Sequence, residues 1–130
     1  MSFIKNIPHE EIVALADQVN AEPGQIVSKT LAQNPHVSVT LFAFAKDEEI
    51  STHDSTGDAM VYVLEGTGQF TVDGVAYVLN AGESIVMPAK KPHAVYAKEN
   101  FKSFGWEFSV TCLRDESPFL FCCINYMYYV

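Results

Sequence analysis

Two histidines, His53 and His93, are the residues of this chain whose type and placement are best suited to chemistry. Each lies at a predicted strand, and a predicted hairpin turn at residues 73–74 separates them. A neutral imidazole can bind a transition metal ion, accept a proton or accept a hydrogen bond. Asp54 and Asp58 follow the first histidine closely, and either could add a carboxylate. The chemistry open to the chain depends on whether the fold brings the two imidazoles together.

The elements that must position these histidines are predicted to be short strands. From residue 25 onward, apolar residues tend to recur at every second position, which is typical of strands, and turn residues divide this pattern. Before it, residues 8–20 carry an apolar stripe behind Pro8 and two glutamates, which predicts a short helix. Many short strands with one helix predict an all-β sandwich or barrel. The predicted strands are residues 25–31, 37–45, 49–53, 59–65, 68–72, 75–79, 84–87, 93–97 and 101–108.

Composition limits the class of partner. At 130 residues, with 48% hydrophobic and 18% charged residues, the chain is expected to form one packed domain. Its 16 acidic and 8 basic residues give a formal net charge of -8, which argues against nucleic acid and against an anionic membrane surface. No apolar stretch reaches the ~20 residues that span a bilayer. A small molecule or another protein is the expected partner.

The cysteines and the C-terminal residues are less informative about function than the histidines. Cys112, Cys122 and Cys123 have no ligand-like spacing, and an odd count with two adjacent cysteines fits a reducing compartment. We therefore expect a cytoplasmic protein. Residues 109–130 are rich in aromatic residues and are expected to cover a sheet edge or a dimer seam, with an exposed apolar arm as the alternative.

The two histidine segments resemble the two sequence motifs of the cupin superfamily, the RmlC-like jelly rolls. The first motif has a glycine, two histidines, a glutamate and a closing glycine, and these positions hold Asp47, His53, Ser55, Ala59 and Gly66. The second motif has a glycine, a proline, a glycine, a histidine and an asparagine, and these positions hold Gly82, Pro88, Lys90, His93 and Ala97. The resemblance implies a cupin jelly-roll barrel over residues 25–108, between an N-terminal helical segment, 1–24, and a C-terminal extension, 109–130.

The resemblance also implies a metal site that is incomplete. In metal-binding cupins, both histidines and the glutamate of the first motif join the histidine of the second motif around one divalent ion. Only His53 and His93 supply such donors here, because Ser55 is a weak ligand and Ala59 has no donor atom. A transition metal such as Fe, Mn, Ni or Zn is therefore expected to be weakly bound or absent. Either aspartate that follows His53 could complete a face of two histidines and one carboxylate.

The family pattern directs alternate residues of the strand at 59–65 into the barrel. The predicted pocket consists of His53, Ser55, Ala59, Val61, Val63 and His93. Asp58 then points away from this pocket unless the turn at residues 56–57 redirects it, and its simpler role is to cap that turn. His93 follows a proline, which favours the extended conformation expected at a strand start.

Three functions are compatible with these residues. The first is a non-catalytic cupin that binds or senses a small molecule, with His53 and His93 orienting the ligand in an apolar pocket. The second is a metal-dependent enzyme of the dioxygenase or isomerase type that uses both histidines and an aspartate. The third is a metal-free acid–base enzyme of the sugar-epimerase type, in which a histidine acts as general base. A homodimer is expected from the family and from the surplus of apolar residues on the strands.

Overall fold

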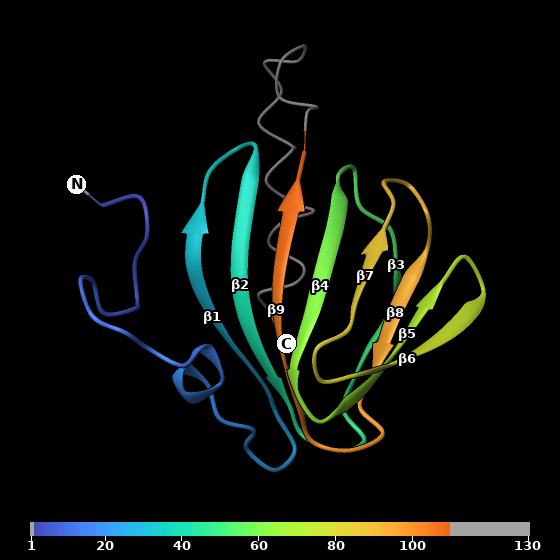
Figure 1. Ribbon diagram of the computed structural model, residues 1–130. Coiled ribbons are helices and arrows are strands. Elements are labelled where there is room, and N and C mark those ends of the chain that lie inside the picture. Colours follow the sequence, from blue (N-terminus) through green and yellow to red (C-terminus); the bar gives the residue numbers. More distant parts are fainter. Residues whose placement is uncertain (1, 110–130) are drawn as a thin grey trace.

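Nine strands form two facing antiparallel sheets in the computed structural model, which describes residues 2–109 (Figure 1). One sheet has the order β1-β2-β9-β4-β7, and the other has the order β3-β8-β5-β6. The all-β jelly-roll fold that the sequence predicts is thereby confirmed. The strands are β1 (Ile26–Gln33), β2 (Val37–Phe44), β3 (Glu49–His53), β4 (Asp58–Glu65), β5 (Thr67–Val72), β6 (Val75–Asn80), β7 (Ser84–Met87), β8 (His93–Tyr96) and β9 (Phe101–Phe108).

The strand ends agree with the sequence pattern because the turns are encoded locally. Every predicted strand is present, and the ends differ by no more than two residues. Asp73 and Gly74, between β5 and β6, have φ angles of 49° and 82°. Positive φ at both positions is what a type I′ hairpin turn requires, and Gly adopts it without steric cost.

The core fills the space between the two sheets. Phe70 of β5 and Phe101 of β9 are each almost completely buried there, with ring centroids 5.9 Å apart. β2 is buried on both faces: Phe42 and Phe44 point into this core, and the alternate residues Leu41 and Ala43 belong to a second cluster. A strand buried on both faces must therefore be covered on its outer side by something other than the second sheet.

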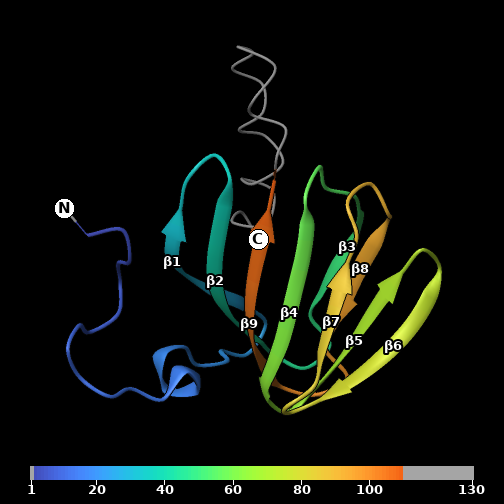
Figure 2. The same ribbon diagram turned by 45° about the horizontal axis from the view of Figure 1, so that its top comes forward.

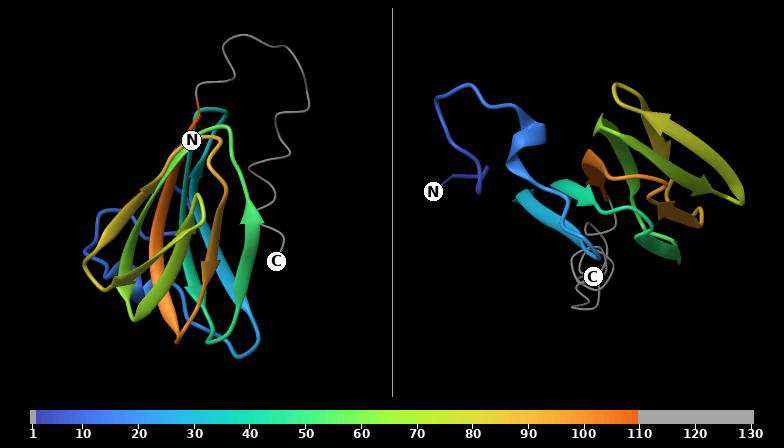
Figure 3. Two further views of the ribbon diagram at one scale, coloured as in Figure 1. Left: turned by 90° about the vertical axis from the view of Figure 1, so that its right-hand side faces the viewer. Right: turned by 90° about the horizontal axis from the view of Figure 1, so that it is seen from below.

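The N-terminal segment contributes to that second cluster, although it does so without the predicted helix. Over residues 8–20 the only helical turn is the 3-10 turn η1, Leu15–Gln18. Glu10 adopts a positive φ of 59°, which an α-helix does not tolerate, and Ile12 is fully exposed. Leu15 and Val19 still pack into this cluster, with η1 lying against β4 and β9, whereas Ile12 does not, so the predicted apolar stripe is only partly correct. Figures 2 and 3 show this segment lying beside β1, on the side of the molecule away from β6.

No helix within residues 2–109 is long and apolar enough to cross a membrane. Cys112, Cys122 and Cys123, with the predicted extension beyond Ser109, lie outside the described residues.

Candidate functional site

The register of β3 on β8 places His53 directly opposite His93. Glu49 and Ile50 pair in regular antiparallel register with Tyr96 and Val95, and a one-residue shift follows before His53. Ile50 is buried, so regular alternation would turn His53 to the opposite face of β3. The irregularity, which has the form of a β-bulge, reverses that alternation and aims the imidazole toward its partner. The ring centroids are 4.3 Å apart in an edge-to-face arrangement.

Each imidazole is oriented by the carbonyl group two residues before it. His53 Nδ1 lies 2.9 Å from the Ser51 carbonyl oxygen, and His93 Nδ1 lies 3.0 Å from that of Lys91. A carbonyl oxygen can only accept, so each neutral ring carries its hydrogen on Nδ1 and leaves a lone pair on Nε2. The site therefore presents two neighbouring hydrogen-bond acceptors or metal donors.

Burial favours the neutral form of His93. His93 is 2% exposed, and burial lowers its pKa below the ordinary value of 6.5. The hydrogen bond with the Lys91 carbonyl opposes this shift, while the nearby His53 lowers the pKa further and Asp54 raises it. His53 Nε2 is buried and has no hydrogen-bond partner. A buried polar atom without a partner costs on the order of 1–3 kcal/mol, so it marks a place where another group is expected to bind.

The remaining polar residues of the first motif are engaged elsewhere. Ser55 is buried, and its hydroxyl donates to the Gly57 carbonyl oxygen at 2.8 Å. Asp58 is exposed, and its carboxylate accepts a 2.7 Å hydrogen bond from the backbone N–H of Ala89. Within residues 2–109, no cluster of three or more His, Cys, Asp or Glu side chains could hold a metal ion. The structure thus brings the two histidines together and does not bring Asp54 or Asp58 to them as a third ligand.

The backbone of both motifs keeps its special conformations even where glycine has been replaced. Asp47 and Lys90 occupy glycine positions of the family motifs, and both adopt positive φ, 71° and 64°. Lys90 N–H donates to the Ser55 carbonyl oxygen at 2.7 Å, which ties the segment before His93 to the segment after His53. The Asp47 carboxylate accepts a hydrogen bond from the Tyr96 hydroxyl at 2.9 Å.

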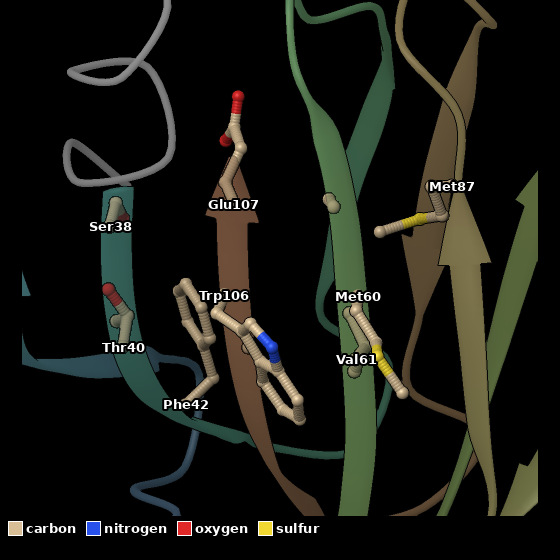
Figure 4. Close-up of a pocket in the computed structure, with 10 residues that line it drawn as sticks. Ser38, Thr40, Phe42, Met60, Val61, Met87, Trp106 and Glu107 are labelled. Carbon is tan, nitrogen blue, oxygen red and sulfur yellow. The ribbon is translucent and has the colours of Figure 1, made fainter. Parts of the chain in front are cut away.

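A cavity of about 30 Å³ lies among residues of β2, β4, β7 and β9 (Figure 4). Of the predicted pocket residues, Ala59 and Val61 line this cavity, whereas Val63 is completely buried in the core. Neither histidine belongs to its lining. The volume suffices for a water or a single polar group. The lining consists of Ser38, Thr40, Phe42, Ala59, Met60, Val61, Met87, Gly105, Trp106 and Glu107.

Glu107 is a site residue that sequence analysis missed. It lies on β9, where it is the register partner of Ser38 in β2 and of Ala59 in β4. Burial raises the pKa of its carboxyl above the ordinary value of 4.5, and a side-chain hydrogen bond with Ser55 opposes that shift. The only signal in the sequence was its alternation with Ser103 and Gly105 along one strand face. That signal becomes informative only when the pairing of β4 with β9 is known.

Comparison with known proteins places the chain among the cupins. The cupin domain family model matches residues 40–102. A conserved protein of unknown function from Streptococcus pyogenes is 40% identical over 85% of this chain and 96% of its own, with a TM-score of 0.83. A cupin superfamily protein from Desulfitobacterium hafniense is 31% identical over 84% of this chain and 100% of its own, with a TM-score of 0.80.

A more distant match shares the fold alone. Salicylate 1,2-dioxygenase from Pseudoaminobacter salicylatoxidans is 20% identical over 67% of this chain and 25% of its own, with a TM-score of 0.61. No match was found among the curated proteins.

The environment of Glu107 predicts an unusual dependence of stability on pH. Because the folded chain holds this proton to higher pH than the unfolded chain, the native protein loses stability as pH rises from 4.5 through the raised pKa. Glu107→Gln removes this loss, so the variant's free energy of unfolding should increase relative to the native protein across that window. Urea unfolding at a series of pH values measures the difference. Glu99→Gln, at an exposed loop, is the matched control, and a difference that stays constant or falls with pH contradicts the assignment.

Proposed function

Since the chain belongs to the cupin superfamily, we propose that it binds a small molecule inside the barrel through the Nε2 atoms of His53 and His93, which accept hydrogen bonds from the ligand. The observation that carries the proposal is the buried, unpartnered Nε2 of His53 next to a second neutral imidazole. Neither Nε2 atom carries a hydrogen that it could donate to the other. A hydrogen-bond donor must therefore come from a bound molecule. The function is binding or sensing, and the ligand has at least one hydroxyl or N–H group.

The surroundings narrow the ligand class further. The barrel interior along β4 is apolar, with Ala59, Val61 and Val63 buried there, so a ligand inside the barrel should have an apolar body. The chain carries a net charge of -8, and an anion would meet lone pairs at both imidazoles. A neutral molecule with a hydroxyl group on an apolar frame fits these properties, and a carboxylate such as the gentisate in the dioxygenase complex does not.

Metal chemistry is a weaker match for this donor set. The hydrogen bonds from Nδ1 to carbonyl oxygens are of the kind that orients metal-binding histidines. However, a transition metal site normally has at least three protein ligands, and the described residues provide two. The donor set therefore does not fit a firmly held ion.

The acid–base alternative also lacks a necessary part. A histidine that acts as general base is usually held and polarised by a carboxylate on its second nitrogen. Here a backbone carbonyl occupies that position on His53 and on His93 alike. The geometry therefore favours binding over proton transfer.

The cellular and quaternary predictions remain proposals. A cytoplasmic location depends on the three cysteines alone. A second copy of the chain is the partner we propose for the open edges at β6 and β7, where several large apolar side chains are half exposed and border a groove of about 650 Å³. These side chains are Tyr77, Val78 and Val86. An exposed apolar edge strand is prone to pair with another chain, so a dimer would cover it.

Nitrogen NMR tests the histidine assignment directly. Phenol, which donates a hydrogen bond, should shift the Nε2 resonances of His53 and His93, and anisole, which has a similar shape and no donor, should not. His9 and His36 are exposed and serve as internal controls in the same spectrum. If phenol leaves both buried Nε2 resonances unmoved, the proposal is wrong.

Metal analysis of protein purified without a histidine tag separates binding from metal catalysis. We expect Fe, Mn, Ni and Zn together to be far below one ion per chain after dialysis, because two neutral donors hold such ions weakly. The His53→Ala variant should contain the same amount, as should His36→Ala. A near-stoichiometric ion that only His53→Ala removes would overturn the proposal in favour of a metal site.

Light scattering tests the proposed dimer. The native chain should have twice the mass of one chain, and Val78→Lys, which places a charge on the exposed edge strand, should shift the mass toward the monomer. Ile12→Lys is the matched control, since Ile12 is equally apolar and fully exposed on the N-terminal segment. A native monomer, or a dimer that Val78→Lys leaves intact, contradicts this interface.

A further inference from the structure

A carboxyl group stands one strand away from the position where the first family motif has its glutamate. That position is Ala59 of β4, and its register partner on β9 is Glu107. Glu107 belongs to neither motif, yet its side chain lines the interior cavity and forms a hydrogen bond with Ser55. Because Ser55 is two residues after His53, Glu107 connects the cavity with the histidine segment.

The Ser55 hydroxyl interacts with both Gly57 and Glu107. It donates to the Gly57 carbonyl oxygen at 2.8 Å. Its hydrogen bond with Glu107 favours the ionised carboxylate and so lowers the pKa of that carboxyl, whereas burial, the larger effect, favours the neutral acid and raises the pKa. The second carboxyl oxygen keeps its lone pairs for another partner.

The cavity beside this carboxyl accommodates one polar group rather than a whole ligand. Its volume is about 30 Å³, and the side chains of Phe42, Val61 and Met87 form apolar walls. In Figure 4, Ser38 and Glu107 lie at one end of the lined region, and Phe42 and Val61 lie toward the other. A hydroxyl group that enters among these residues finds an acceptor at the polar end.

We propose that Glu107 and Ser55 form a second ligand-contacting site, in which the carboxyl of Glu107, next to Ser55, accepts a hydrogen bond from a hydroxyl group of the bound molecule. This inference rests on the proposed function and adds a requirement to it: the ligand carries a hydroxyl group that reaches the cavity on β9. An ammonium group is the competing donor, and it would need the ionised carboxylate in place of the neutral acid.

Glutamate labelled with ¹³C at the side-chain carboxyl provides the test. The Glu107 resonance is identified by its absence in Glu107→Gln, and its position at neutral pH reports whether the carboxyl is protonated. Phenol should shift this resonance, whereas anisole should not. Methylammonium is the probe for the competing donor, and a response to it together with an ionised resonance would overturn the proposal.

Two variants supply an independent measurement of phenol affinity. Glu107→Gln keeps an N–H donor for Ser55 and a carbonyl acceptor for the ligand, so its affinity should remain within about twofold of native, whereas Glu107→Leu should bind at least about threefold more weakly. Ser55→Ala, which removes the anchor and leaves the carboxyl, should also weaken binding and serves if the leucine variant does not fold. Equal affinity in Glu107→Leu or Ser55→Ala and the native protein would overturn the proposal.

The two proposals fail separately. A phenol response at His53 and His93 without one at Glu107 leaves the proposed function intact and removes this inference. A response at Glu107 alone shows that the cavity binds the hydroxyl group without the histidines, which refutes the histidine assignment. If neither group responds, both are wrong.

Discussion

The site depends on one cross-strand contact, the pairing of His53 with His93 at the end of β3 and β8. A strand presents alternate residues to opposite faces, so a shift of one residue decides whether an imidazole faces the barrel interior or the opposite side of the sheet. The irregularity between Ile50 and His53 makes that shift, and the two carbonyl hydrogen bonds then fix both rings. The orientation of both Nε2 atoms and the unpartnered nitrogen of His53 follow from this local geometry.

The loops around the pair show that two glycine positions of the motifs accept other residues without loss of the backbone conformation. Asp47 and Lys90 adopt the left-handed conformation at positions where the motifs have glycine, at a cost on the order of 1–2 kcal/mol each. Such conformations persist when the surroundings determine them. Lys90 is held by its hydrogen bond to the Ser55 carbonyl, and Asp47 by its N–H donated to the Ala97 carbonyl oxygen at 2.8 Å. The strand framework therefore positions His53 and His93 although other motif residues differ.

The sequence predicted those features whose causes are local. Turn residues and period-two patterns marked all nine strands, because each turn is specified by its own residues, as at Asp73-Gly74. The N-terminal helix was wrong because Leu15 and Val19 pack into the second cluster from an irregular segment, and this packing overrides the local pattern. Glu107 was missed for the opposite reason, since its role arises only from the pairing of β9 with β4, which no local pattern encodes.

The absence of a carboxylate at Ala59 changes what the two imidazoles require. Two neutral rings with hydrogens on Nδ1 cannot satisfy each other, since neither Nε2 has a hydrogen to give. Protonation of one ring would supply that hydrogen, but burial lowers the pKa of His93 and so opposes it at neutral pH. The missing hydrogen must then come from a third group, and within the described residues His53 Nε2 finds none. The proposed role of the two imidazoles is therefore to accept hydrogen bonds from a ligand that has a donor group. In other cupins the same fold could instead direct its donor atoms at a metal ion.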